Sequence, residues 1–313
     1  MPGTRLTMPL VAPPQYDLSL ARTCSFLVNV GSNMGDQFAN WRAANPKLPA
    51  TDFTSAWIPK DNCPITSSDH SLNDYYIANL IFGTIAYKAT TEPFAFTAVS
   101  KLDVRAAFLV FRGTKTVADL HVDADHSQTG YLSPFGDVWG KVDKGFFDLF
   151  KTMEPSVAAV LLALFAAGPA AQRSLVITGH SLGSALATLT VPLAVSLARR
   201  YGAKVQQYNQ ASPRVGDPKF AAHFNALEAP TYRLVNIEDV VPTVPDPESK
   251  TILGTADYQH VGSQASFSAQ YLSIPNNHNP CCSYSYALYN PEEPFNPTPG
   301  NCFSASEVLA PPE

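Results

Sequence analysis

The chain has 313 residues, enough for one large domain or two small ones, and its 45% hydrophobic content allows a sizeable core. Only 15% of the residues are charged and the formal net charge is −5, which argues against nucleic-acid binding as the main task. No apolar run reaches the roughly 18–20 residues that a membrane span needs, so no transmembrane segment is predicted.

The N-terminal half predicts an irregular start followed by helices and a pair of strands. The 27 prolines, several of them near the N-terminus, favour long ordered loops. In chain order we expect an irregular arm over 1–15, a helix over 16–30, loops with short elements over 31–71, an amphipathic helix over 73–89, strands over 94–100 and 106–111, and a polar loop over 117–137.

The C-terminal half predicts strands that alternate with helices. We expect a helix over 145–167, a strand over 174–178, a helix over 182–200, a strand over 205–209, a helix over 218–225, a strand over 231–237 and a loop-rich part over 246–313. Alternation of this kind is typical of an α/β fold with a parallel sheet. Because neither a linker nor a repeat interrupts it, we expect a single domain over 1–313.

The cysteines and the N-terminus leave the compartment of the protein open. Cys24, Cys63, Cys281, Cys282 and Cys302 contain no C-x-x-C pair. One or two disulfides are possible, and the odd number leaves at least one cysteine over. The first residues lack the apolar region and cleavage site of a signal peptide.

The most informative stretch is Gly179-His180-Ser181-Leu182-Gly183, a G-x-S-x-G between an apolar strand and an Ala-rich helix. Strand, sharp turn and helix form the context of a nucleophile elbow, in which a strained serine presents its hydroxyl above the sheet. Glycines on both sides let strand and helix approach closely. We therefore predict Ser181 as a catalytic nucleophile.

A serine nucleophile needs a base within hydrogen-bond reach and a carboxylate that orients the base. In elbow enzymes the acid and then the histidine follow the serine along the chain. Asp239 directly follows the strand predicted over 231–237, so it lies at the same sheet edge as Ser181. His260 and His278 both satisfy the order, and position alone does not choose between them.

Two hydrogen-bond donors are needed for the oxyanion that forms during attack. One is the backbone amide of Leu182, at the first turn of the helix after the serine. The other should come from the loop after an earlier strand, where Gly113 and Thr114 lie. His180 is expected to be a packed structural residue that points away across the elbow.

A competing cluster lies at His121-Val-Asp123-Ala-Asp125-His126. Two histidines and two aspartates within six residues resemble the donor set of a metallo-hydrolase. The pattern differs from H-x-H-x-D-H at one paired histidine, and no downstream ligand is evident. A solvated polar loop explains it better, so we predict no metal site and no cofactor.

Several segments together resemble the class 3 (fungal-type) triacylglycerol lipases, in the order that this family has. They are Val110-Phe111-Arg112-Gly113-Thr114, the GHSLGSALA run over 179–187, Pro213-Arg214-Val215-Gly216-Asp217, and Asn236-x-x-Asp239-x-Val241-Pro242-x-x-Pro245. The resemblance extends over 73–278. It implies an α/β-hydrolase fold, with a central, mostly parallel sheet flanked by helices, and hydrolysis of carboxylic esters without a cofactor.

Carried over to this sequence, the resemblance assigns Ser181 as nucleophile, Asp239 as acid, and Thr114 and Leu182 as oxyanion donors. Residues 258–262 resemble a Tyr-x-His-x-Gly stretch that is not catalytic in the family. The resemblance therefore favours His278 over His260. It also implies an ester or lipid substrate and contact with a lipid–water interface, and it leaves the oligomeric state open.

The sequence departs from the family pattern at two places. Asp143 stands where a histidine is usual, and 115–125 is shorter than the family's lid and carries no aromatic residue. In length this loop is closer to that of feruloyl esterases. The first interpretation is a triacylglycerol lipase. The alternatives are a short-chain or feruloyl-type esterase with the same triad and two interpretations from different classes. These are a lipid- or partner-binding protein without turnover and a metallo-hydrolase that uses the cluster from His121 to Asp125.

Overall fold

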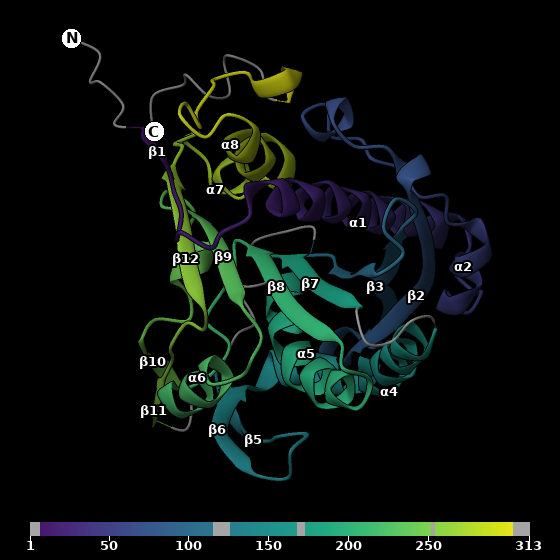
Figure 1. Ribbon diagram of the computed structural model, residues 1–313, viewed down its shortest axis with the longest axis vertical. Helices are drawn as coiled ribbons and strands as arrows, with labels where there is room; N and C mark the ends of the chain where they lie inside the picture. The colour runs from purple at the N-terminus through teal and green to yellow at the C-terminus, as the bar shows by residue number, and fades with distance from the viewer. Residues whose placement is uncertain (1–6, 115–125, 168–172, 252–253, 303–313) are drawn as a thin grey trace.

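The computed structural model describes residues 7–114, 126–167, 173–251 and 254–302. Within them, one sheet has the strand order β1-β12-β9-β8-β7-β4-β3-β2 (Figure 1). Its neighbours from β12 to β4 are parallel, and β1, β3 and β2 are antiparallel to theirs. These strands are β1 (Met8–Val11), β2 (Tyr75–Ile85), β3 (Thr90–Ser100), β4 (Ala106–Phe111), β7 (Ser174–His180), β8 (Lys204–Gln210), β9 (Thr231–Asn236) and β12 (Ser263–Ser268).

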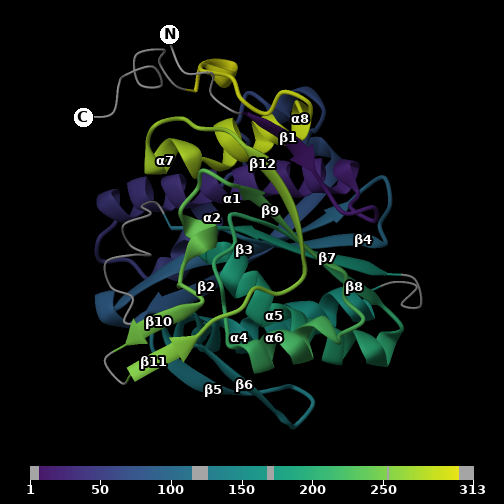
Figure 2. The ribbon, with the colours of Figure 1, turned by 90° about the vertical axis from the view of Figure 1, so that its left-hand side faces the viewer.

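Helices cover both faces of this sheet, with α1 on one face and α4 and α5 on the other (Figure 2). Two small hairpins, β5–β6 and β10–β11, lie outside it. The predicted fold class, α/β with a mostly parallel sheet between helices, is confirmed. The remaining elements are α1 (Leu18–Ala44), α2 (Phe53–Ala56), β5 (Gln128–Leu132), β6 (Val138–Asp143), α4 (Lys144–Ala166), α5 (Leu182–Ala198), α6 (Pro218–Asn225), β10 (Glu248–Thr251), β11 (Gly254–Asp257), α7 (Ile274–Asn277), the π-helix η8 (Pro280–Ser285) and α8 (Tyr286–Tyr289).

The central strands are apolar on both sides because each side faces a helix layer. In β4, Leu109 and Phe111 pack with α4 and α5, whereas Phe108 and Val110 pack with α1. Successive side chains of a strand point to opposite faces, so a doubly covered strand reads as a continuous apolar run. This explains why the central strands were predictable from sequence.

The helix predicted over 73–89 is wrong, because residues 75–85 form the edge strand β2. Its pairing with β3 shifts register between Ala78 and Ile81, and Asn79 has a φ of 56°. A bulge inserts a residue and exchanges the faces on which apolar residues lie. The resulting spacing of apolar residues imitates the period of a helix, and this explains the wrong prediction.

Both ends of the chain contain more structure than their composition suggests. Met8–Val11, within the arm expected to be irregular, pairs antiparallel with β12. β12 itself lies in the loop-rich part and pairs parallel with β9. Its sequence, SQASFS, is too polar to be identified as a buried strand, since only Ala265 and Phe267 supply apolar side chains.

Helix α1 continues well beyond the predicted end at residue 30, through Gly31 and Gly35. Both glycines face Arg112 on the end of β4. A Cβ at Gly35 would lie 3.2 Å from Arg112 Cδ. The glycines that suggested a helix end therefore make room for this buried arginine.

Two described helices, α4 and the stretch from α5 to Tyr201, are long and apolar enough to cross a membrane by length and composition alone. Core helices of globular proteins pass the same test, so this is weak evidence. Both helices pack on the sheet, and 78% of the most apolar 18-residue stretch of the second helix is buried. Their apolar character is explained by the core.

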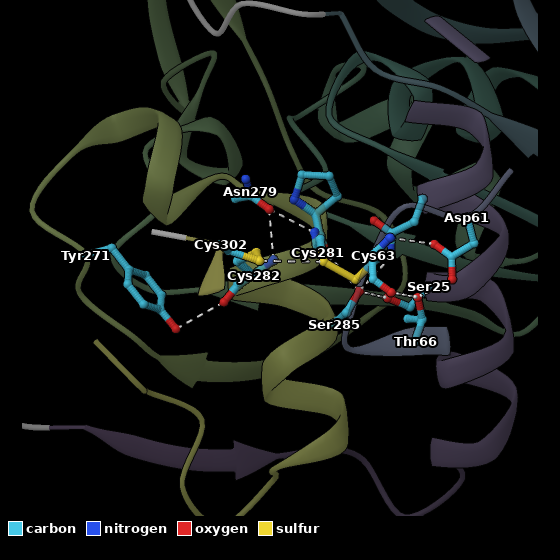
Figure 3. The surroundings of a disulfide bond; sticks show 12 residues. Ser25, Asp61, Cys63, Thr66, Tyr271, Asn279, Cys281, Cys282, Ser285 and Cys302 are labelled. Carbon is cyan, nitrogen blue, oxygen red and sulfur yellow. Dashed lines mark hydrogen bonds between the residues drawn. A yellow bond between two sulfur atoms is a disulfide. The ribbon is translucent and has the colours of Figure 1, made fainter. Parts of the chain in front are cut away.

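Two disulfides hold the segment that follows His278. Cys63–Cys281 joins residues 218 positions apart, and Cys282–Cys302 closes a shorter loop (Figure 3). Asn279 Oδ1 accepts from the amides of Cys281 and Cys282 at 3.0 and 2.8 Å, which fixes the start of η8. Cys24 is a free, buried thiol, and burial raises its pKa to about 12.

Candidate active site

Ser181 lies at the tight turn between β7 and α5, with a φ of 59° and a ψ of −129°. This conformation is costly for a residue with a side chain, at roughly 1–3 kcal/mol. The turn requires close backbone contacts on either side. A Cβ at Gly179 would lie 2.4 Å from Gly183 O, and one at Gly183 would lie 2.4 Å from Phe111 O. The geometry is that of the predicted elbow.

Gly183→Ala tests how far the site depends on this close packing. The added methyl group cannot avoid Phe111 O and Arg112 O without moving β4 or α5. We expect a loss of roughly 1–3 kcal/mol of stability, by the usual cost of overpacking, together with a large loss of activity. Chemical denaturation measures the first effect. Gly130→Ala is the control, since its Cβ would meet nothing within 4 Å and should be tolerated.

Asp239 and His278 lie together beside this elbow. His278 Nδ1 is 2.7 Å from Asp239 Oδ2, and both side chains are buried. Asp239 Oδ1 accepts from the Val241 amide at 3.0 Å, which fixes the carboxylate. The His278 ring packs against that of His180, with ring centroids 4.4 Å apart. Since His180 directly precedes Ser181, this contact places the His278 imidazole next to the serine turn.

His260 lies elsewhere, although the residues alone left it open as the base. Its Nε2 is 2.8 Å from Pro242 O, and no described carboxylate contacts its ring. Burial, reinforced by the charge of Arg233, lowers the pKa of His260 to about 3. A neutral histidine held against a backbone carbonyl has a structural role in this position.

His180 is buried, as expected, but it does not point away from the site. Its ring contacts His278 and also Tyr284, at a centroid distance of 5.6 Å. Burial, followed by the charge on His278, lowers the pKa of His180 well below its usual value. The imidazole therefore stays neutral and presents a packing surface to its neighbour.

A network of side-chain amides ties the acid to the histidine segment. Asn236 Nδ2 donates to Ala269 O and Asn277 O, at 2.9 and 3.1 Å. Asn277 Nδ2 in turn donates to Glu238 O at 2.8 Å. Two residues shortly before Asp239, Asn236 and Glu238, are thus bonded to Asn277, which precedes His278. This fixes one segment relative to the other across a sequence separation of 39 residues.

The predicted oxyanion donors lie on two segments that meet at the elbow, the chain after β4 and the start of α5. A Cβ at Gly113 would lie 3.1 Å from Ser181 Cβ, so the chain leading to Thr114 runs directly past the serine. Arg112 fixes this loop by donating to Gly113 O at 2.9 Å and to Glu92 at 2.6 Å. Leu182 begins α5, where backbone N–H groups lack helical partners.

Thr114 and Leu182 also line one end of a cavity of about 730 Å³. A volume of this size is typical of small-molecule sites. The cavity extends between α1, the N-terminal turn of α4 and the connection from β2 to β3. Its apolar lining includes Phe38, Ala39, Ile85, Phe146 and Leu149.

The expected short lid falls in 115–125, outside the described residues, and so does most of the competing metal cluster. Of the cluster, only His126 is described. Its Nδ1 is 3.8 Å from Asp143 Oδ2, and Asp143 caps α4 by accepting from the Phe146 amide. Asp143 thus has a structural role at the position where the family usually has a histidine.

Part of the chain is similar to known lipases. Residues 108–249, which include Ser181 and Asp239, match the family described as Lipase (class 3). This match covers less than half of the chain. A lipase from Rhizomucor miehei is 32% identical over 145 residues, which are 45% of this chain and 38% of that lipase. The secreted mono- and diacylglycerol lipase A of Penicillium cyclopium is 26% identical over 80% of this chain and 74% of its own length.

A solved structure supports the same fold. A triacylglycerol lipase, described as having a serine protease triad at its catalytic centre, superposes with a TM-score of 0.57. The identity is 24%, and the match covers 82% of each chain. At this identity the likeness shows the fold alone.

Sequence reasoning missed three residues of the site, namely Asn236, Asn277 and Tyr284. The sequence contained a signal for Asn236, because this residue begins the segment over 236–245 that resembles the family. Asn277 and Tyr284 had no such signal, since their partners Asn236 and Asp239 are 41 and 45 positions away in the sequence.

Proposed function

We propose that this class 3 lipase homologue hydrolyses carboxylic esters of lipids through Ser181, His278 and Asp239. The observation that carries the proposal is the Asp239–His278 hydrogen bond of 2.7 Å beside the strained Ser181 turn. The charge-assisted bond to a buried carboxylate orients the imidazole and stabilises its protonated form. The cavity beside Thr114 and Leu182 has an apolar lining, which suits a lipid acyl chain.

In the first step Ser181 Oγ bonds to the ester carbonyl carbon, and its proton moves to His278 Nε2. The carbonyl oxygen becomes an anion, for which the Leu182 amide and Thr114 are the proposed donors. When the intermediate collapses, the carbon–oxygen bond to the alcohol breaks and the alcohol takes the proton from His278. Ser181 is left acylated.

In the second step water replaces the alcohol. His278 takes a proton from the water as the water oxygen bonds to the acyl carbon. When the second intermediate collapses, the bond between that carbon and Ser181 Oγ breaks, His278 returns the proton to Oγ, and the acid is released. Asp239 stays ionised throughout and holds the imidazole in the required tautomer. No part of this cycle calls for a cofactor.

The cavity beside Thr114 and Leu182 is the proposed acyl-chain site. Ala39→Trp, on α1, narrows it from an exposed position, so folding should be unaffected. We expect kcat/KM to fall about tenfold for octanoyl esters and to change little for acetyl esters. Ala44→Trp is the matched control, because Ala44 is an exposed residue of the same helix that does not line the cavity. Equal loss on both esters would reject this site for the chain.

The experiment for the proposed activity is a rate curve on tributyrin taken through its solubility limit, with Ser181→Ala as the blank. A rate that rises sharply when droplets appear indicates a lipase acting at an interface. A hyperbola that ignores the droplets indicates an esterase with an open site. No rate above the blank, on tributyrin and on soluble esters, would contradict the proposal and favour a binding protein.

A further inference from the structure

Tyr284, on η8, places its hydroxyl against the carboxylate that orients His278. Its Oη is 2.6 Å from Asp239 Oδ2, the same oxygen that accepts from His278 Nδ1. The tyrosine side chain is fully buried, between Phe267 and His180. A buried, charge-assisted bond of this length is among the stronger hydrogen bonds in a protein.

The direction of this hydrogen bond follows from the other partner of the hydroxyl. Tyr284 Oη accepts from the backbone N–H of Asn236 at 3.3 Å, so the hydroxyl proton of Tyr284 can point at Asp239. Burial, together with the nearby carboxylate, raises the pKa of Tyr284 well above its usual value, so the hydroxyl stays protonated. Asp239 therefore has three described donors: Tyr284, His278 and the Val241 amide.

We propose that Tyr284 is a positioning residue that sets the orientation and the basicity of His278 through Asp239. This inference rests on the proposed function. By sharing the negative charge on Oδ2, the hydroxyl weakens the hold of Asp239 on a protonated imidazole. It also fixes the plane of the carboxylate, and its ring supports His180, which packs on His278.

The charged and titratable groups around His278 in the described residues are few. Asp239 bonds to it from the end of β9, His180 faces it from β7, and Tyr284 reaches Asp239 from η8. Glu238 is directed to Ser268 and Gln270, at 2.9 Å each. Since His180 is neutral, Asp239 and the hydroxyl that modulates it dominate the charge next to the imidazole.

The test is the pH profile of kcat/KM for Tyr284→Phe, on a soluble ester. The acid limb of this profile reports the imidazole that must be neutral to act as base. Without the hydroxyl, Asp239 holds a proton on His278 more strongly, so the limb moves to higher pH, by about one unit. At the plateau, kcat should fall about tenfold with KM unchanged, since the imidazole is less well oriented.

Tyr271→Phe is the matched control. Tyr271 is equally buried, and its hydroxyl donates to Cys282 O at 3.1 Å on the same π-helix, away from Asp239. Its removal should lower the melting temperature without moving the acid limb. An acid limb of Tyr284→Phe that coincides with wild type, or that moves equally in both variants, overturns the inference.

A second substitution tests the role of Tyr284 if Tyr284→Phe folds poorly. Incorporation of 3-fluorotyrosine at position 284 retains the ring and makes the hydroxyl a better donor. The acid limb should then move to lower pH, and an unchanged limb or a shift to higher pH contradicts the inference. The Ser181→Ala blank separates the two proposals: full activity in that variant rejects the proposed function, whereas an unmoved limb with a dead Ser181→Ala rejects only the role of Tyr284.

Discussion

Replacement of Ser181 by alanine is expected to lower kcat on a short-chain ester by a factor on the order of 10⁴ to 10⁶. In the proposed mechanism this hydroxyl forms the acyl-enzyme, and the φ of 59° at this position is that of the strained elbow serine. Substrate binding should be little affected, since the cavity and the backbone donors remain. The measurement is kcat and KM on purified protein, with product release followed for hours.

Ser184→Ala is the control for this experiment. Ser184 lies one turn along α5, and its Oγ is 2.7 Å from both Gly179 O and Gln210 O, which share its one proton. Its loss should weaken the elbow and lower the melting temperature, while turnover survives. Residual turnover within tenfold of wild type in Ser181→Ala, with the ester bond still cleaved, would mean that another group is the nucleophile.

The second large effect separates the two histidines that the residues alone left open. His278→Ala is expected to lower kcat by about 10⁴-fold or more, because the base is lost. His260→Gln should change kcat by less than about tenfold, since that ring is held by Pro242 O and no described carboxylate contacts it. Both variants are compared by kcat at the plateau of the pH profile and by melting temperature.

The opposite pattern has a clear meaning. If His260→Gln abolished turnover while folding normally, and His278→Ala did not, the assignment of the base would be wrong. The 2.7 Å bond from His278 to Asp239 would then be structural. Loss in both variants with a collapsed melting temperature for His260→Gln would reflect its buried position.

The elbow was predictable from sequence because its determinants are local. The strand before Ser181, the two glycines and the helix after it are contiguous, and each has a steric reason at the turn. Asp239 was predictable for a related reason, since it directly follows an apolar strand. Parallel strands present their carboxyl ends at one edge of the sheet, which places these two residues near each other.

His278 could be preferred only by resemblance, because nothing local distinguishes its surroundings from those of His260. Its place depends on β12, a strand too polar to be recognised, and on the amide network from Asn236 to Asn277. Tyr284 lies on a π-helix six residues further on, and its contact with Asp239 arises from tertiary packing. The bulge in β2 hid a strand in the same way, because it broke the alternation that identifies one.

The most direct test of the central claim is to label the protein with a fluorophosphonate and to identify the modified residue by mass spectrometry. We predict one adduct, on Ser181, that forms in wild type with loss of ester hydrolysis and is absent from Ser181→Ala. An active protein that takes no label, or that carries the label on another residue, would contradict it.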